Sequence, residues 1–485
     1  MKLSDISLLK TRAYVDGRWI GADSGETFKV TNPATGEVVA EVARCGGDET
    51  RRAIEAAEKA QVEWRKKTAG ERSVLMRRWF DLMMEAQEDL AQILTAEQGK
   101  PLAEARGEIA YGASYIEWFA EEAKRVYGDT IPPPANDRRI VVIKQPVGVV
   151  ACITPWNFPN AMLARKVAAA LAAGCTTVCK PATATPLSAF AMAELADLAG
   201  IPAGVINVLA GHTGAIGGEL TSNPTVRKLT FTGSTEVGKK LVADCAQTMK
   251  RTSMELGGNA PFIVFDDADL DNAIQGTLAS KYRNAGQTCV CANRILVQES
   301  VMEEYSAKLA EAVTQLKLGN GAEDGVTMGP LIDDAAADNV VAMIDDATAK
   351  GAKVMLGGGR SKLGGSFIEP TILSGVTNNM RVFREEIFGP VSPLVSFSTE
   401  EEAIAIANDT QFGLAAYFCA RDVGRIWRVA EGLEYGIIGI NEGIISNAMA
   451  PFGGIKESGN GREGSKYGLD DYLEIKYLCI GGIDA

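Results

Sequence analysis

Between residues 147 and 249, short apolar segments alternate with segments of helical periodicity, and this alternation constrains the fold most strongly. The pattern predicts strands over 147–153, 176–179, 205–209 and 228–231, and helices over 162–173, 187–198 and 237–249. Strands that alternate with helices form a parallel sheet covered by helices on both faces. The sequence therefore predicts a doubly wound α/β domain, in which ligands bind at the carboxyl ends of the strands.

The flanking regions have other patterns. Residues up to about 46 alternate β-like runs with turns, and residues 48–127 show apolar side chains three and four positions apart, as in helices. A Pro-rich turn at 131–134 precedes a predicted strand over 138–143, and a second region of alternating strands and helices runs from about 261 to 440. The last residues, from about 470, predict a short strand with a loose tail.

Composition excludes several chemistries. The chain has one histidine, His212, so it cannot build zinc sites that need two or three imidazoles, and a catalytic triad would require that one residue. We expect no metal. The net charge of −13 argues against a nucleic-acid partner. No segment resembles a signal peptide or a membrane span, and the nine cysteines form no disulfide framework, so we expect a cytoplasmic protein with reduced thiols.

A glycine-containing turn follows the predicted strand at 228–231. Gly233 and Gly238 match the first and last glycines of a dinucleotide fingerprint, but Thr235 stands at the middle position. Such a turn can hold a pyrophosphate at a helix N-terminus, or it can be only a tight turn. On its own it is a weak indication of nucleotide binding.

Three polar residues have the chemistry of a reactive site. Cys289 lies in a turn-like segment where substrate could reach a thiol, although a single cysteine is more often a buried apolar residue. Glu255, beside two glycines, could serve as a base, or could be a surface residue at a helix end. Asn157 lies between two prolines after a strand, where its amide could donate to an oxyanion or simply stabilise a turn.

Together these segments resemble the aldehyde dehydrogenase superfamily nearly from end to end. The motifs occur in the order of the family: TPWNFP at 154–159, KPA at 180–182, FTGS at 231–234, MELGGNAP at 254–261, GQTC at 286–289, EEIFGP at 385–390 and PFGGIKESG at 451–459. RNAGQTCVCANR around Cys289, with SKYG and LEIKY near the end, is most similar to the succinate-semialdehyde dehydrogenase branch.

The resemblance implies a role for each matched residue. Cys289 would be the nucleophile, Glu255 the general base, and Asn157 an oxyanion donor together with the backbone N–H of Cys289. The residues implied to bind the cofactor are Thr154, Trp156, Lys180, Thr183, Gly233, Ser234, Glu386 and Phe388. The thiolate would attack an aldehyde, hydride would leave for a nicotinamide, and water activated by Glu255 would hydrolyse the thioester. A coenzyme A-acylating enzyme is the rival class, and Glu255 argues against it because that reaction does not need activated water.

The resemblance also implies a three-part fold. A cofactor-binding domain would comprise residues 1–123 and 145–254, and a catalytic domain residues 255–447, with 448–467 returning to the cofactor domain. A small β element, at 124–144 and 468–485, would mediate oligomerisation. Unpaired strand edges in a monomer favour a homodimer or a homotetramer, with a tetramer as a dimer of dimers expected.

The branch implies an anionic semialdehyde as substrate. Arg165, Arg283 and Ser446 match the positions that hold the distal carboxylate, and paired arginines suit that group, although an arginine is usually a surface charge. Succinate semialdehyde is the predicted substrate. Glutarate semialdehyde or a sulfonate remains an alternative, because one methylene rarely changes the free energy by more than about 1–3 kcal/mol.

Cofactor choice and redox control depend on two further positions. Thr183 replaces a glutamate of NAD-selective relatives and removes a repulsion toward a 2′-phosphate, so we expect NADP to be accepted, even preferred, with NAD also used. Cys291, two residues after the nucleophile, matches a cysteine that pairs with the nucleophile in some members of the branch. An extended backbone would direct the two thiols to opposite faces, which argues against that disulfide.

Overall fold

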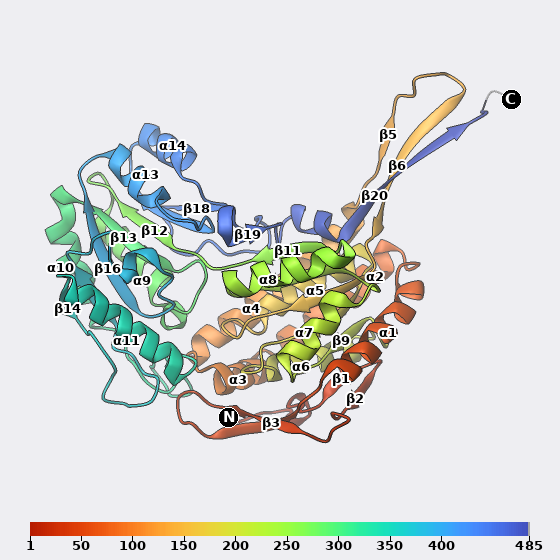
Figure 1. The fold of residues 1–485 in the computed structure, drawn as a ribbon, viewed down its shortest axis with the longest axis horizontal. Coiled ribbons are helices and arrows are strands. Elements are labelled where there is room, and N and C mark those ends of the chain that lie inside the picture. Colours follow the sequence, from red (N-terminus) through yellow and green to blue (C-terminus); the bar gives the residue numbers. More distant parts are fainter. Residues whose placement is uncertain (484–485) are drawn as a thin grey trace.

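The computed structural model describes residues 1–483, which form two lobes, each built on a sheet, and a projecting arm (Figure 1). The first sheet has eight strands in the order β19-β11-β10-β7-β8-β9-β1-β2. Their bounds are β1 Ala13–Val15, β2 Arg18–Ile20, β7 Val149–Ile153, β8 Thr176–Lys180, β9 Ile206–Val208, β10 Val226–Thr232, β11 Arg251–Glu255 and β19 Gly459–Asn460. The five strands from β11 to β9 are parallel, which confirms the α/β fold predicted for residues 147–249.

Helices cover both faces of this sheet. The helices of the lobe are α1 Gly47–Trp64, α2 Ala69–Glu85, α3 Gln87–Gln98, α4 Leu102–Glu122, α5 Ala161–Ala173, α6 Leu187–Leu198, α7 Thr213–Ser222 and α8 Thr235–Cys245. Helices α2 to α6 pack together on one face, and α1, α7 and α8 pack along the other. Helix α5 is buried along its entire length between α4 and the sheet, so it forms the centre of the lobe.

The second sheet has seven strands in the order β14-β15-β16-β13-β12-β17-β18. Its strands are β12 Ala260–Val264, β13 Ala292–Gln298, β14 Lys353–Leu356, β15 Thr371–Ser374, β16 Val391–Phe397, β17 Ala415–Cys419 and β18 Ile437–Ile440. The helices packed around it are α9 Leu270–Lys281, α10 Met302–Val313, α11 Asp334–Ala349, α12 Arg381–Arg384, α13 Glu400–Asn408 and α14 Val423–Gly432. All its neighbouring strands are parallel except β14 and β15, which confirms the second alternating region.

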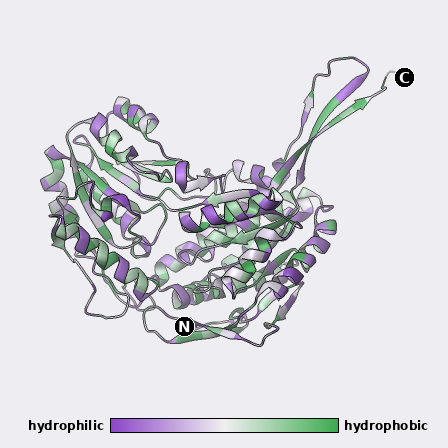
Figure 2. Ribbon diagram, in the orientation of Figure 1, coloured by the Kyte–Doolittle hydropathy of each residue, from purple (hydrophilic) through white to green (hydrophobic). Residues whose placement is uncertain are grey.

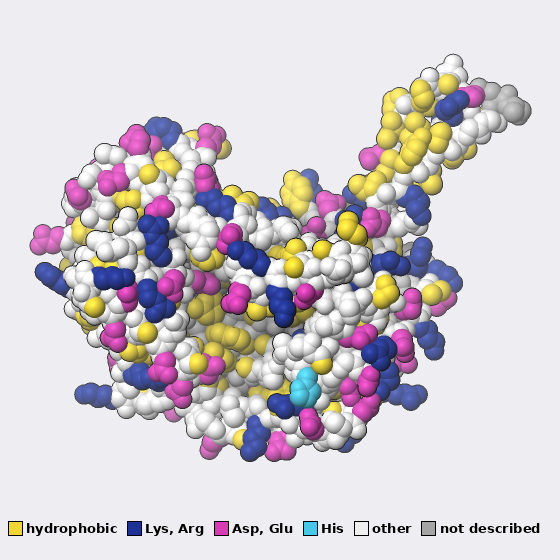
Figure 3. All heavy atoms as spheres, viewed as in Figure 1, with side chains coloured by type: hydrophobic (Ala, Val, Ile, Leu, Met, Phe, Trp, Pro, Cys, Tyr) yellow, Lys and Arg dark blue, Asp and Glu magenta, His cyan; other side chains and the backbone are white. Residues whose placement is uncertain are grey.

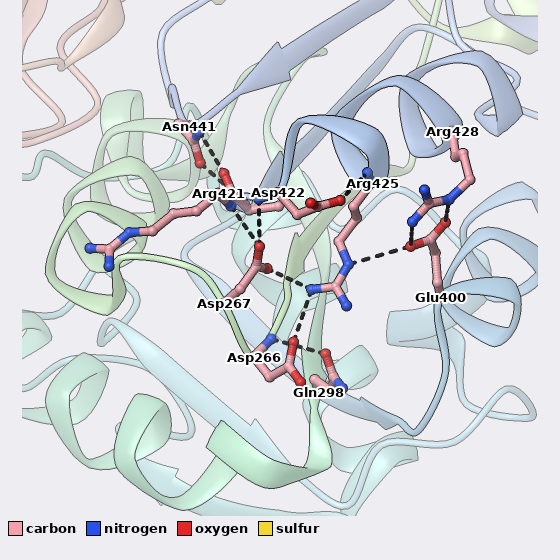
Figure 4. Close-up of polar contacts among 10 residues, drawn as sticks. Asp266, Asp267, Gln298, Glu400, Arg421, Asp422, Arg425, Arg428 and Asn441 are labelled. Carbon is pink, nitrogen blue, oxygen red and sulfur yellow. Dashed lines mark hydrogen bonds and ion pairs between the residues drawn. The ribbon is translucent and has the colours of Figure 1, made fainter.

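Ion pairs fix the outer helices of this second lobe (Figure 4). Arg425 on α14 contacts Asp266 at 2.9 Å, Asp267 at 2.6 Å and Glu400 at 3.3 Å. Glu400 begins α13 and also pairs with Arg428 at 2.7 Å. The cluster therefore joins α13 and α14 to the loop that follows β12.

A three-stranded antiparallel arm, in the order β20-β6-β5, projects from the first lobe (Figure 1). Its strands are β5 Asp129–Ile131, β6 Arg138–Pro146 and β20 Leu473–Gly481, and a separate hairpin pairs β3 Thr27–Thr31 with β4 Val38–Ala43. The arm contains many hydrophobic residues (Figure 2), and their side chains are visible on its surface (Figure 3). Ile475 and Tyr477 are 72% and 60% exposed. The prediction of a short terminal strand was too conservative, because β20 pairs with β6 over nine residues.

Most predicted elements lie within a few residues of the observed ones. Helix α6 has the predicted bounds, and α5 begins one residue earlier than predicted. Helix α8 begins at Thr235 rather than at 237, because the Ser234 side chain caps it by accepting from the backbone N–H of Val237. A 3₁₀ turn and a left-handed Met249 end that helical region early. No helix within residues 1–483 is both long and apolar enough to cross a membrane.

Candidate active site

A cavity of about 240 Å³ opens between the two lobes, at the carboxyl ends of β10 and β11. Its walls include Cys289, Glu255 and Asn157, the three predicted reactive residues. The full lining is Pro155, Trp156, Asn157, Thr232, Gly233, Ser234, Glu255, Leu256, Gly257, Cys289, Glu386 and Phe388. These residues come from loops after β7, β10 and β11 and from two loops of the second lobe. The fold therefore gathers them from five separate segments.

Cys289 is held by a loop of unusual backbone conformation. Asn284 and Ala285 have positive φ angles of 52° and 54°, and Gly286 has a φ of 78°. A Cβ at Gly286 would overlap the carbonyl oxygen of Gly389, so this glycine lets the loop pack closely against the segment before β16. Burial raises the pKa of the Cys289 thiol to about 12, and the charge of Arg165 acts in the opposite direction. At neutral pH the thiol is protonated and needs a base to accept its proton.

Glu255 is suited to accept that proton. It ends strand β11 and is only 2% exposed, and both of its carboxylate oxygens have no hydrogen-bond partner among residues 1–483. Burial raises its pKa well above the usual range, and the nearby carboxylate of Glu463 raises it further. A carboxylate with a raised pKa is a stronger base at neutral pH. The reading of Glu255 as a surface residue is wrong.

Asn157 offers a free amide hydrogen. The residue is buried, and its Nδ2 donates to the carbonyl oxygen of Gln287 at 3.0 Å. An amide nitrogen carries two hydrogens, so one remains for a group in the cavity. The arrangement can stabilise negative charge on an oxygen bound beside Cys289.

The same cavity has features of a nucleotide site. Gly233 and Ser234 stand at the N-terminus of α8, where backbone N–H groups and the helix dipole favour phosphate. Trp156 and Phe388 meet edge to face, with ring centroids 5.5 Å apart. Glu386 Oε1 accepts a hydrogen bond from the backbone of Gly258 at 3.0 Å, and burial raises its pKa to about 7.

Three predicted cofactor residues lie outside this lining, at the ends of β7 and β8. The backbone N–H of Thr154 donates to the Lys180 carbonyl at 3.1 Å, and Thr183 follows three residues after Lys180. Lys180 is 4% exposed; its ammonium contacts the Pro181 carbonyl at 3.4 Å and forms no ion pair within the described chain. Burial lowers its pKa to about 8. A buried cation without a counter-ion can bind an anionic group such as a phosphate.

A second cavity, of about 260 Å³, contains two of the three predicted carboxylate-binding residues. Arg283 and Ser446 both line it, beside Phe158, which directly follows Asn157. The remaining lining residues are Glu104, Gly107, Glu108, Tyr111 and Ile444. The guanidinium carbon of Arg283 lies 5.4 Å from the centroid of the Phe158 ring. The structure therefore brings Arg283 and Ser446 together.

Arg165 is not part of that lining. It is 1% exposed, its Nε forms an ion pair with Glu463, and its guanidinium lies 4.5 Å from the centroid of the Phe452 ring. Its Nη1 and Nη2 atoms have no hydrogen-bond partner within residues 1–483. Its predicted role in substrate binding stays a prediction.

Cys291 is buried and absent from the lining around Cys289. Its thiol donates to the backbone carbonyl of Lys281 at 3.4 Å. All nine cysteines are free. The argument against a Cys289–Cys291 disulfide stays a prediction.

Sequence reasoning missed the buried charges beside Glu255. Glu463 pairs with both Arg165 and Lys166, and its charge contributes to the raised pKa of Glu255. The signal was available in part, because Glu463 follows the glycine-rich motif at 451–459 closely. Glu104, Glu108 and Tyr111 were also missed, since they lie on helix α4, far from any motif.

Comparisons with known proteins agree with this site. The aldehyde dehydrogenase family model matches residues 19–478. A glutarate-semialdehyde dehydrogenase of Pseudomonas aeruginosa is 64% identical over 483 residues, covering 100% of both chains. The succinate-semialdehyde dehydrogenase [NADP(+)] of Escherichia coli is 61% identical over 481 residues, covering 99% of this chain and 100% of the relative.

Solved structures share the fold. The crystal structure of a succinate-semialdehyde dehydrogenase from Burkholderia pseudomallei has a TM-score of 0.98 and 61% identity, and the match covers 99% of this chain and 100% of the other. These likenesses extend over essentially the whole chain, including the segments that carry Cys289 and Glu255. The protein belongs to the aldehyde dehydrogenase family.

Proposed function

We propose that this enzyme oxidises succinate semialdehyde to succinate with NADP or NAD as hydride acceptor. The observation that carries the proposal is a pair of neighbouring cavities: Asn157 lines the first, and the next residue, Phe158, lines the second. One contains Cys289, Glu255 and Asn157, and the other contains the cation of Arg283. Such a pair suits a short substrate with an aldehyde at one end and an anion at the other. Glutarate semialdehyde, or another anionic semialdehyde, is the alternative with the same mechanism.

The reaction uses residues of this chain at each proton transfer. Glu255 accepts the proton of the Cys289 thiol, and the thiolate attacks the aldehyde carbon. The amide of Asn157 and the backbone N–H of Cys289 donate to the resulting oxyanion. When bound, a nicotinamide would accept hydride from the carbon attached to Cys289. Loss of that hydride converts the adduct on Cys289 into a thioester. Glu255 releases the first proton to solvent and then takes another from water, and the resulting hydroxide attacks the thioester carbon. The Cys289 thiolate leaves, takes that proton from Glu255, and the carboxylic acid is released.

Cofactor binding follows from the charges around the first cavity. We infer that Gly233 and Ser234 bind the pyrophosphate, and that Glu386 accepts the hydroxyls of the nicotinamide ribose. Trp156 and Phe388 enclose the nicotinamide end. Lys180 and Thr154 lie toward the adenosine ribose, where the neutral Thr183 permits a 2′-phosphate. The NADP-linked relative from Escherichia coli supports this cofactor choice.

Substrate binding relies on the second cavity. Arg283 and Ser446 bind the distal carboxylate, and the two unpartnered Nη atoms of Arg165 would complete the set. One relative at 64% identity is named for glutarate semialdehyde and another at 61% is named for succinate semialdehyde. These names support an anionic semialdehyde as the substrate class, without deciding the number of carbons in the substrate.

Assembly and domain roles complete the proposal. The sheet of β1–β2, β7–β11 and β19 would belong to the cofactor domain, the sheet of β12–β18 to the catalytic domain, and the arm to oligomerisation. The exposed apolar side chains of the arm, such as Ile475 and Tyr477, favour burial against another copy. We propose a homotetramer, built as a dimer of dimers. The nine free cysteines favour the reducing cytoplasm.

The test is the formation of reduced nicotinamide by the purified protein. Succinate and glutarate semialdehydes are each assayed with NADP and NAD, using the wild type and Cys289→Ala. We expect the highest kcat/KM with succinate semialdehyde and NADP, and no turnover by the variant. Higher kcat/KM for glutarate semialdehyde would change the substrate and keep the mechanism. Turnover by Cys289→Ala would refute the mechanism.

A further inference from the structure

A buried ion pair lies against the backbone of Asn157. Lys100 and Glu108 are 2% and 3% exposed, and the Lys100 ammonium donates to Glu108 Oε2 at 2.6 Å. The same ammonium also donates to the backbone carbonyl of Asn157 at 2.7 Å. A charged donor makes this an unusually strong contact for a loop carbonyl.

Glu108 connects the ion pair to the start of helix α5. Its second oxygen, Oε1, accepts from the backbone N–H groups of Asn160 at 3.0 Å and Ala161 at 3.2 Å. A carboxylate at a helix N-terminus satisfies N–H groups that have no partner within the helix. The pair therefore fixes the loop between β7 and α5 at two points, Asn157 and the first turn of α5.

Asn284 connects the same carbonyl to the nucleophile loop. Its Nδ2 donates to the Asn157 carbonyl at 3.0 Å and to the Gln287 carbonyl at 3.1 Å. The Gln287 carbonyl is also the acceptor for the Asn157 side chain. Asn284 itself is held by Glu104, which accepts from its backbone N–H at 2.9 Å. One buried network thus joins the loop of Asn157 to the loop that carries Cys289.

We propose that Lys100 is a positioning residue for the oxyanion hole, and that Glu108 holds its ammonium against the Asn157 carbonyl. The inference rests on the proposed function, in which Asn157 and the backbone of Cys289 bind the oxyanion. Lys100 touches neither substrate nor cofactor; it fixes the loop from which the Asn157 amide is presented.

The energetics of buried ion pairs favour this role. Replacing both partners of such a pair with apolar side chains often leaves stability unchanged, so the double variant can be expected to fold. A displacement of about 1 Å of a catalytic group can reduce a rate by about 100-fold. Lys100 contacts the backbone of Asn157, and a shift of about 1 Å in the Asn157 amide would be enough to slow the reaction in this way.

The experiment compares variants that remove the charge with variants that remove the Asn157 amide. Lys100→Met/Glu108→Met removes both charges and leaves no unpaired ion. We expect its kcat to fall by about 10–100-fold, while the Kd for NADP stays unchanged. Because Glu108 lines the second cavity and Lys100 does not, the KM for succinate semialdehyde is compared in Lys100→Met, where it should change less than kcat. The matched control, Arg106→Met/Glu88→Met, removes an exposed ion pair between α4 and α3 and keeps full activity.

A second background separates positioning from general structural damage. Asn157→Ala removes the amide, so adding the Lys100/Glu108 substitutions to it should lower kcat no further. Lys100→Gln, which keeps a donor toward the Asn157 carbonyl, should retain more activity than Lys100→Met; this comparison stands if the double variant does not fold.

Three results would overturn the inference. These are unchanged kcat in the folded double variant, an equal fall in the Asn157→Ala background, and equal activity of Lys100→Gln and Lys100→Met. Unchanged kcat in Asn157→Ala alone would refute the oxyanion role in the proposed function, and this inference with it. The two failures can be told apart. If only the inference about Lys100 is wrong, Asn157→Ala will have a low kcat while Lys100→Met keeps the kcat of the wild type.

Discussion

Replacing Arg283 with methionine should weaken catalysis with anionic semialdehydes selectively. Arg283 lines the second cavity, and it forms no ion pair with any residue of the chain from 1 to 483. Its guanidinium is therefore available to an incoming carboxylate. A hydrogen-bonded contact to a charged group contributes about 1.5–3 kcal/mol. At about 1.4 kcal/mol for each factor of ten, kcat/KM for succinate semialdehyde should fall by about 10–150-fold.

The assay follows reduced nicotinamide with two aldehydes of equal chain length. Butanal lacks the carboxylate, so its kcat/KM should be the same for the wild type and Arg283→Met. Methionine keeps much of the side-chain volume and the contact with Phe158, which limits changes in packing. An equal fall with both aldehydes would show that Arg283 supports the loop rather than binding the substrate. An unchanged kcat/KM for succinate semialdehyde would remove Arg283 from the site.

Three further predictions concern the cofactor and stability. Thr183→Glu should raise the KM for NADP about tenfold by repulsion of the 2′-phosphate, or about 1.4 kcal/mol, and change the KM for NAD little; steady-state kinetics would contradict this if both changed equally. Glu386 has its pKa raised to about 7 by burial, and only the ionised carboxylate accepts both ribose hydroxyls, so NADP affinity should increase as pH rises through about 7 and then level off. Fluorescence titration checks this, and a Kd that is flat with pH in the wild type would refute it. Arg425→Met leaves three carboxylates without their shared cation and should lower the melting temperature by about 2–4 °C; an unchanged melting temperature would mean that the cluster in Figure 4 adds no stability.

The sequence predicted the parts of the fold where local pattern and burial agree. Helix α6 could be predicted because its apolar residues lie between a proline and a glycine. Strand β11, with the sequence RTSME, was missed because its residues are mostly polar, although Glu255 at its end is buried. The length of β20 was also missed. Its partner β6 is more than 300 residues away in sequence, and no local signal reports that pairing.

The site was predicted where chemistry is carried by short motifs. Cys289, Glu255 and Asn157 lie in separate motifs, and the structure brings them to one cavity. The wall formed by α4 could not be predicted, since Glu104 and Glu108 read as ordinary charges on a helix. Arg165 shows a related limit: every residue of α5 is buried, so periodicity cannot tell which cavity a side chain faces.

Trapping the acyl-enzyme tests the central claim most directly. Glu255→Gln removes the base that activates water, so the thioester on Cys289 should accumulate. The variant is incubated with NADP and succinate semialdehyde at mildly alkaline pH, where the small ionised fraction of Cys289 reacts slowly and the thioester survives. It is then quenched in acid, digested and examined by mass spectrometry. We predict that the peptide containing Cys289 gains the mass of one succinyl group, with one equivalent of NADPH formed per site. NADPH formation without an adduct, or an adduct on another residue, would contradict the account.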